Sequence, residues 1–207
     1  YIFTRRTAKG TLPKNPGLVK SFVTTTLIDK IAKDYDATLY NTLTGFKYIG
    51  EIISKLDKKN EEDRFVMGTE ESYGYLFGNQ VRDKDAVVAA MMAAEMAAFY
   101  KKEGKTLYDI LIEIQEKYDF YVNTVESLIF EGASGSEKIK SLMDKLRKDA
   151  PKTFANHKVI SIGDYLKSVR QINGKGEEKI DLPKSNVLEY KMENGSSIIV
   201  RPSGTEP

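Results

Sequence analysis

Cysteine is absent from this sequence of 207 residues. Its absence excludes a disulfide framework, thiol catalysis and cysteine-bound metal, and it is compatible with the reducing cytoplasm, where we expect the protein to reside. Long apolar runs are also missing, because the longest stretch, residues 86–100, is interrupted by Glu95 and is too short to cross a bilayer. No cleavable signal pattern begins the chain, so we expect no membrane partner.

An excess of charge of either sign is missing as well. The chain has 32 Lys and Arg residues against 30 Asp and Glu residues, a net charge of +2. A surface that coats a polyanion needs a larger positive excess, so we expect no nucleic-acid partner. The one histidine, His157, is assigned no role, because a lone histidine entering a strand is more often a surface or structural residue.

The N-terminal half alternates short apolar segments with amphipathic ones. Residues 1–17 carry Gly10, Pro13 and Pro16 and are predicted to form a loop. The segments that follow predict, in order, a strand at 18–24, a helix with a capping-box-like start at 26–29, a strand at 37–40, a helix over 46–56 and a strand at 64–68. This order is typical of a parallel, doubly wound α/β unit.

Two more helices are predicted before the pattern changes. Residues 85–100 are rich in Ala and Met on nearly every face, which indicates a helix buried on several sides. Gly104 is in the position that ends such a helix, and Thr106 and Asp109 cap the next one.

The C-terminal part predicts one helix among several hairpin-like strands. Residues 120–130 are strand-like, a helix is predicted from Ser136, and Asn194-Gly195 is a hairpin signal between two late strands. This pattern favours a separate α+β domain with an antiparallel sheet. We therefore predict a partial α/β domain over 1–118 and an α+β domain over 119–207.

The last seven residues, Arg201-Pro202-Ser203-Gly204-Thr205-Glu206-Pro207, have the composition of a phosphate-binding loop. Arg201 supplies a permanently charged fork of donors, two hydroxyls can each donate a hydrogen bond, and the glycine lets the backbone approach an anion. The alternative is a hairpin exit loop with an incidental arginine. Since the chain stops in this loop and begins at Tyr1, we expect it to be part of a longer polypeptide.

Three further segments carry polar side chains where predicted strands end or a helix begins. They are residues 68–75 (Gly-Thr-Glu-Glu-Ser-Tyr-Gly-Tyr), 42–47 (Thr-Leu-Thr-Gly-Phe-Lys) and 82–85 (Arg-Asp-Lys-Asp). In a doubly wound sheet, ligands bind beyond the carboxyl ends of the strands, and a helix N-terminus favours anions. The alternatives are an exposed acidic turn, a plain capped loop and a charged helix cap, respectively.

In their order along the chain, these four segments resemble the α-D-phosphohexomutase family, the phosphoglucomutases and phosphomannomutases. The resemblance covers essentially the whole chain, which looks like most of the family's sugar-recognition domain followed by most of its phosphate-binding lid. It implies that Glu70, Ser72, Gly45 and Phe46 bind the sugar. It implies that the phosphate is bound by Arg201, Ser203, Gly204, Thr205, Lys84 and, by a weaker match, Lys20.

The resemblance also implies a reaction that interconverts hexose 1-phosphate and hexose 6-phosphate through a phosphoserine and a bisphosphate intermediate. Magnesium and an activator of the glucose 1,6-bisphosphate type would serve the full-length enzyme. The family's serine loop, Thr-x-Ser-His-Asn-Pro, and its magnesium loop, Asp-x-Asp-x-Asp, are absent from this sequence. We therefore assign no catalytic residue and no metal ligand here, expect the missing N-terminal domains as partners, and predict that the fragment alone is inactive.

Three alternatives to a glucose-directed enzyme remain open. Phosphomannomutase or phosphopentomutase specificity is possible within the family, although Ser72 disfavours the pentose. A non-catalytic phosphosugar-binding module fits the same residues, and a structural scaffold predicts no response to ligand.

Overall fold

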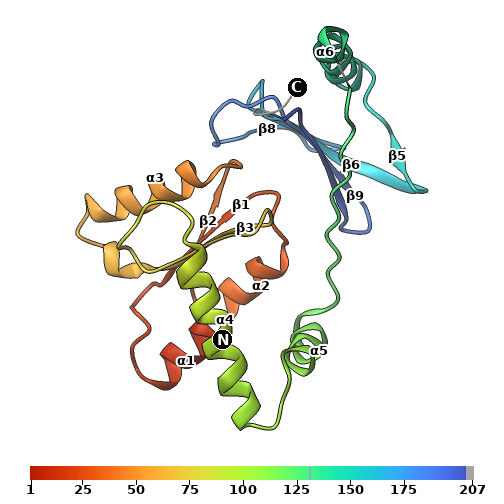
Figure 1. Ribbon diagram of the computed structural model, residues 1–207. Helices are drawn as coiled ribbons and strands as arrows, with labels where there is room; N and C mark the ends of the chain where they lie inside the picture. Colours follow the sequence, from red (N-terminus) through yellow and green to blue (C-terminus); the bar gives the residue numbers. More distant parts are fainter. Residues whose placement is uncertain (131, 204–207) are drawn as a thin grey trace. The chain divides into compact units, whose positions relative to one another are not determined.

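The chain forms two compact units, Tyr1–Thr124 and Val125–Pro207 (Figure 1). The computed structural model describes residues 1–130 and 132–203, except the side chain at position 133. Within that part, no helix has the length and apolar character needed to cross a membrane.

The first unit is built on a sheet with strand order β2-β1-β3-β4. Its first three strands are parallel, and β4 is antiparallel to β3. Its elements in chain order are α1 (Ile2–Ala8), β1 (Gly17–Ser21), α2 (Leu27–Asp34), β2 (Thr38–Thr42), α3 (Phe46–Asp57), the 3-10 helix η1 (Glu62–Arg64), β3 (Phe65–Glu70), β4 (Gly74–Phe77), α4 (Ala86–Lys102) and α5 (Leu107–Tyr118). The predicted parallel α/β unit is confirmed, with an antiparallel edge strand that the sequence did not indicate.

Apolar side chains cover both faces of this sheet, as the alternation of side chains along a strand requires. On one face, Val19 and Phe65 pack against Ile49 and Ile53 of α3. On the other face, the neighbouring residues in the strands pack against α1 and α2. Figure 1 shows α3 on one side of the sheet and α1 and α2 on the other. The unit therefore has three layers, with the carboxyl edge of the parallel strands left for loops.

Two predictions for the first unit were wrong. The predicted loop at 1–17 contains α1, because its glycines and prolines all follow Ala8 and buried Phe3 anchors the helix against Tyr35. The helix α4 was expected to be buried on several sides, but none of its residues is buried, and Val87 is 79% exposed. The described residues therefore leave the apolar side chains of α4 largely uncovered.

The helix caps show one difference and one agreement. The capping box expected at Thr26 does not form, because Thr26 has helical φ and ψ and its side chain makes no cap hydrogen bond. Thr106 and Asp109 do form the reciprocal capping box at the start of α5, as predicted. Both segments have a threonine three residues before an aspartate, but the Asp29 carboxylate forms an ion pair with Lys20 instead of a cap.

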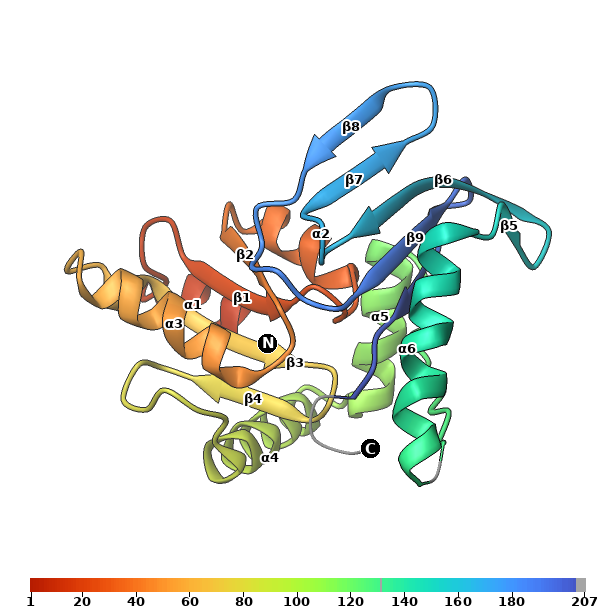
Figure 2. The ribbon, with the colours of Figure 1, turned by 90° about the horizontal axis from the view of Figure 1, so that it is seen from above.

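The second unit has a six-stranded sheet with order β10-β9-β6-β7-β8, and β5 pairs with β6. All its strand pairs are antiparallel, and α6 packs on one face through Met143 against Leu188 and Tyr190. Figure 2 shows α6 beside β9. Its elements are α6 (Ala133–Lys148), β5 (Thr153–Phe154), β6 (His157–Asp164), β7 (Val169–Ile172), β8 (Gly176–Lys179), β9 (Leu188–Met192) and β10 (Ser197–Val200). The predicted α+β class is confirmed.

The strand predicted at 120–130 is absent from the described residues of that segment, which are irregular and largely exposed. Val125 is 80% exposed and Ile129 is 78% exposed. A strand requires a partner for its backbone groups, and apolar alternation alone does not supply one. The helix predicted from Ser136 begins earlier, at Ala133.

Candidate functional site

The parallel strands of the first unit bring three polar chain segments to one edge of the sheet. Ser21 at the end of β1 is opposite Thr42 at the end of β2, and Lys20 is opposite Thr69, one residue before the end of β3. The turn after β1, the loop before α3 and the turn after β3 therefore begin at the same edge. Ligands of doubly wound sheets bind at this edge.

Glu70 is fixed at this edge by the start of α3. The Gly45 N–H donates to Glu70 Oε1 at 2.6 Å, and the Glu70 residue is only 4% exposed. Gly45 has a φ of 117°, a conformation that disfavours side chains, so α3 has no capping side chain of its own. The carboxylate thus satisfies the backbone N–H of the N-cap residue at the positive end of the helix, as the acidic side chain of a capping box does.

Phe46, the first residue of α3, closes the space behind Glu70. A Cβ added to Gly74 would lie 3.1 Å from the Phe46 ring and 3.4 Å from Glu70 Cβ. Gly74 directly faces Glu70 across the β3–β4 pair. Glycine at this position therefore leaves room for the Phe46 ring beside the Glu70 residue.

Ser72 lies in the tight turn that joins β3 to β4. The expected loop over 68–75 is a β-hairpin whose turn consists of residues 71–73. Ser72 is exposed, and Tyr73 beside it has a φ of 61° and is 90% exposed. The hydroxyl of Ser72 is therefore presented to solvent next to the buried Glu70.

Lys84 is tied to the same hairpin through the backbone. The N–H of the next residue, Asp85, donates to the Tyr75 carbonyl at 2.9 Å. Asp85 also caps α4 by accepting from the Val88 N–H. Lys84 is exposed, and its ammonium group has no hydrogen-bond or ion-pair partner among the described residues. The structure thus brings the segment of Lys84 to the strand that pairs with β3.

Lys20 is buried, unlike Lys84 and Arg201 among the predicted phosphate ligands. It is 2% exposed, its Nζ donates to the Thr24 carbonyl at 3.0 Å, and it forms an ion pair with Asp29 Oδ1 at 3.3 Å. That carboxylate oxygen is otherwise buried without a hydrogen bond, so the pair is a charge contact with imperfect hydrogen-bond geometry. A phosphate could reach Lys20 only by replacing these contacts.

The second unit carries the predicted phosphate loop directly after β10. Arg201 and Ser203 are both exposed, whereas Gly204 and Thr205 lie outside the described residues. No partner is found for the Arg201 guanidinium within the described part of the chain. Arg201 is therefore available to an anion in this unit.

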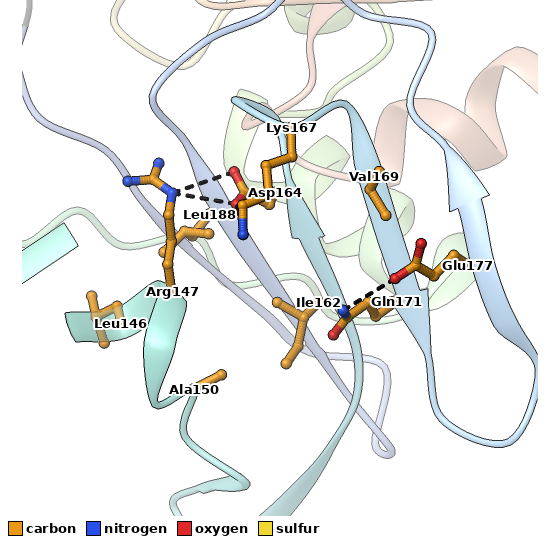
Figure 3. Close-up of a pocket in the computed structure, with 10 residues that line it drawn as sticks. All are labelled: Leu146, Arg147, Ala150, Ile162, Asp164, Lys167, Val169, Gln171, Glu177 and Leu188. Carbon is orange, nitrogen blue, oxygen red and sulfur yellow. Dashed lines mark hydrogen bonds and ion pairs between the residues drawn. The ribbon is translucent and has the colours of Figure 1, made fainter. Parts of the chain in front are cut away.

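The second unit also has a pocket of about 250 Å³ on the α6 face of its sheet (Figure 3). Its charged groups are already paired, since Arg147 Nε lies 3.3 Å from Asp164 Oδ2, and Gln171 donates to Glu177 at 3.3 Å. None of the predicted site residues that the structure describes lines it. The described residues also contain no group of three acidic or histidine side chains that could hold a metal ion.

The family model described as "Phosphoglucomutase/phosphomannomutase, alpha/beta/alpha domain III" matches residues 1–118. The chain belongs to the phosphoglucomutase/phosphomannomutase family. Among curated relatives, a phosphoglucomutase of Staphylococcus haemolyticus (strain JCSC1435) is 38% identical over 95% of this chain and 35% of its own length. A phosphoglucomutase of Staphylococcus aureus (strain MRSA252) is 37% identical over 92% of this chain and 34% of its own length.

A solved structure supports the same fold. The crystal structure of the exocytosis-sensitive phosphoprotein pp63/parafusin (phosphoglucomutase) from Paramecium, in an open form, has a TM-score of 0.54 and 19% identity. The matched region covers 91% of this chain and 30% of the Paramecium protein. The chain thus spans about a third of the length of the phosphoglucomutases it matches.

Two further hydroxyls, which the sequence analysis did not identify, also lie at the carboxyl edge of the sheet. Ser21 Oγ and Thr24 Oγ1 donate to Glu71 Oε2 at 2.9 and 3.0 Å. Their position could have indicated them, because Ser21 ends β1 and Thr24 lies in the turn after it, where polar side chains reach the ligand-binding edge. The separation of about 50 residues hid their partner.

Proposed function

We propose that this chain is the substrate-recognition part of a phosphoglucomutase-type enzyme that interconverts hexose 1-phosphate and hexose 6-phosphate. The observation that carries the proposal is the fixed Glu70 carboxylate next to the exposed Ser72 at the carboxyl edge of the parallel strands. Because the chain spans about a third of its relatives, the activity is proposed for a longer polypeptide.

Each residue has a role that its surroundings permit. The second carboxylate oxygen of Glu70 would accept from a sugar hydroxyl, and the Ser72 hydroxyl would contact a neighbouring position. Gly45 and Phe46 would shape the sugar side. The exposed charge of Lys84 and the fork of Arg201, with Ser203, Gly204 and Thr205, would bind phosphate. Anchoring one dianion in this way orients the other end of the substrate for transfer.

Phosphoryl transfer itself would depend on groups outside these residues. The resemblance implies a phosphoserine, a magnesium ion that assists the transfer when bound, and a bisphosphate activator. The described residues offer no metal cluster, so we derive no step through magnesium from this chain. We propose that the 207-residue chain by itself binds substrate and does not turn it over.

Two experiments test the proposal. Glucose 6-phosphate should raise the unfolding temperature of the chain, and Arg201→Ala should abolish the effect of inorganic phosphate. No shift with either ligand would favour a structural scaffold. In the second experiment, the purified chain is mixed with hexose phosphate, bisphosphate activator and magnesium, and any interconversion would refute the predicted inactivity.

Specificity for glucose over mannose or a pentose is part of the proposal and has its own test. The full-length polypeptide should turn over glucose phosphates faster than mannose phosphates, and both faster than pentose phosphates. The reverse order would favour a phosphomannomutase or phosphopentomutase. A non-catalytic binding module would bind these sugars without turning them over.

A further inference from the structure

The turn that presents Ser72 has a backbone conformation that its own sequence does not favour. Tyr73 adopts a φ of 61°, which costs a residue with a side chain roughly 1–2 kcal/mol relative to glycine. The Tyr73 side chain is 90% exposed, so packing of its ring does not compensate. Contacts elsewhere must therefore hold residues 71–73 in place.

Glu71 supplies these contacts. Its Oε2 atom accepts from Ser21 Oγ at 2.9 Å and from Thr24 Oγ1 at 3.0 Å, and its backbone N–H donates to Thr24 Oγ1 at 3.2 Å. The two hydroxyls lie 2.8 Å apart. Each hydroxyl has a single hydrogen, which it donates either to the carboxylate or to the other hydroxyl, so the carboxylate accepts from at least one of them. Hydrogen bonds to an ionised acceptor are stronger than those between neutral groups.

Thr24 is itself held from the other side. Its carbonyl accepts from the buried Lys20 Nζ at 3.0 Å, and Lys20 forms the ion pair with Asp29 of α2. Ser21 is fully buried in β1. The hydroxyls that bind Glu71 therefore belong to buried residues, at the end of β1 and in the turn that follows it.

We infer that Glu71 is a positioning residue for sugar recognition: its carboxylate fastens the Ser72 turn to the end of β1 through Ser21 and Thr24. This inference rests on the proposed function, because it assumes that Ser72 contacts the sugar. Glu71 itself is directed to the hydroxyls of its own chain. Its contribution is to keep the Ser72 hydroxyl at a fixed place beside Glu70.

The test compares binding of glucose 6-phosphate and inorganic phosphate to the 207-residue chain by calorimetry, together with amide hydrogen exchange at Ser72. Glu71→Ala should lower the affinity for glucose 6-phosphate by about tenfold, as expected from the loss of hydrogen bonds to a charged group, and should speed exchange at Ser72. Affinity for inorganic phosphate should stay unchanged. Glu116→Ala, which removes the same charge from an exposed position of α5, is the matched control.

A second pair of variants separates positioning from folding. Thr24→Val removes the hydroxyl at nearly constant volume and should reproduce the selective loss, whereas Thr24→Ser keeps the hydroxyl and should retain wild-type affinity. Equal glucose 6-phosphate affinity in Glu71→Ala and wild type would overturn the inference and leave the proposed function standing. A parallel fall in affinity for both ligands would also overturn it. A wild-type chain that does not bind glucose 6-phosphate would overturn both.

Discussion

Replacement of Glu70 should separate its structural contribution from its proposed contact with sugar. In the wild type its carboxylate accepts at 2.6 Å from the N–H of Gly45, the N-cap residue of α3. Glu70→Ala removes a buried hydrogen bond to a charged group and leaves the helix start uncapped, so it should cost about 2–3 kcal/mol of unfolding free energy. Glu70→Gln keeps an acceptor oxygen and loses only the charge–dipole attraction, about 0.5–1 kcal/mol.

The assay must report on the first unit alone, because two compact units need not unfold together. Amide hydrogen exchange of α3 and β3 in increasing urea meets this requirement. Glu51→Ala is the control in the same helix, since it removes only the exposed ion pair with Lys55 and should cost about 0.3–0.5 kcal/mol. Equal losses for Glu70→Ala and Glu51→Ala would refute the capping role.

The two Glu70 variants should also differ in what they do to ligand binding. Glu70→Gln should keep the fold and still weaken glucose 6-phosphate binding, because the neutral amide is a poorer acceptor for a sugar hydroxyl. Calorimetry on the folded variant measures this directly. Wild-type affinity in Glu70→Gln would remove Glu70 from the proposed sugar site while leaving its capping role intact.

Three further perturbations test the packing and the electrostatics. Gly50→Ala would gain about 1 kcal/mol from helix propensity, but its Cβ would lie 2.5 Å from the Arg82 carbonyl, so urea titration should show a net loss of about 1–3 kcal/mol rather than a gain. Hydrogen bonds from Thr106 hold the pKa of Asp109 below its ordinary value of 3.8, so the stability deficit of Asp109→Asn should be full above that pH and vanish as the pH falls through the lowered pKa; a deficit independent of pH would contradict this. Glu189→Ala should lower the free energy of unfolding by about 3 kcal/mol in chemical denaturation, because it removes the carboxylate that pairs with the largely buried Arg170 guanidinium. A loss under about 1 kcal/mol would argue against a stabilising Arg170–Glu189 pair.

The sequence predicted those parts of the fold whose signal is local and periodic. Ile49 and Ile53 recur on one face of α3, and both are fully buried against the sheet. The strands β2 and β3 end within two residues of their predicted ends, which placed the polar segments 42–47 and 68–75 at one edge of the sheet. The segment that carries Glu70 and Ser72 was placed at this edge for this reason, whereas the proposed contact of these two residues with sugar comes from the resemblance to the family.

Other features depend on what lies opposite a segment, which a single sequence does not reveal. The apolar residues of α4 and of 120–130 predicted burial, yet Val87 and Val125 are exposed because no described residues cover them. The capping-box pattern at Thr26 failed because Asp29 pairs with Lys20 instead. The contacts of Glu71 with Ser21 and Thr24 were invisible for the same reason.

The most direct test of the account is a glucose 6-phosphate titration of the isotopically labelled chain followed by nuclear magnetic resonance. The account predicts saturable shifts at Gly45, Glu70 and Ser72 in the first unit and at Arg201 and Ser203 in the second. Inorganic phosphate should shift the second set without the first. Saturable shifts confined to other residues, or no saturable shifts at all, would contradict the proposal that this chain recognises a hexose phosphate.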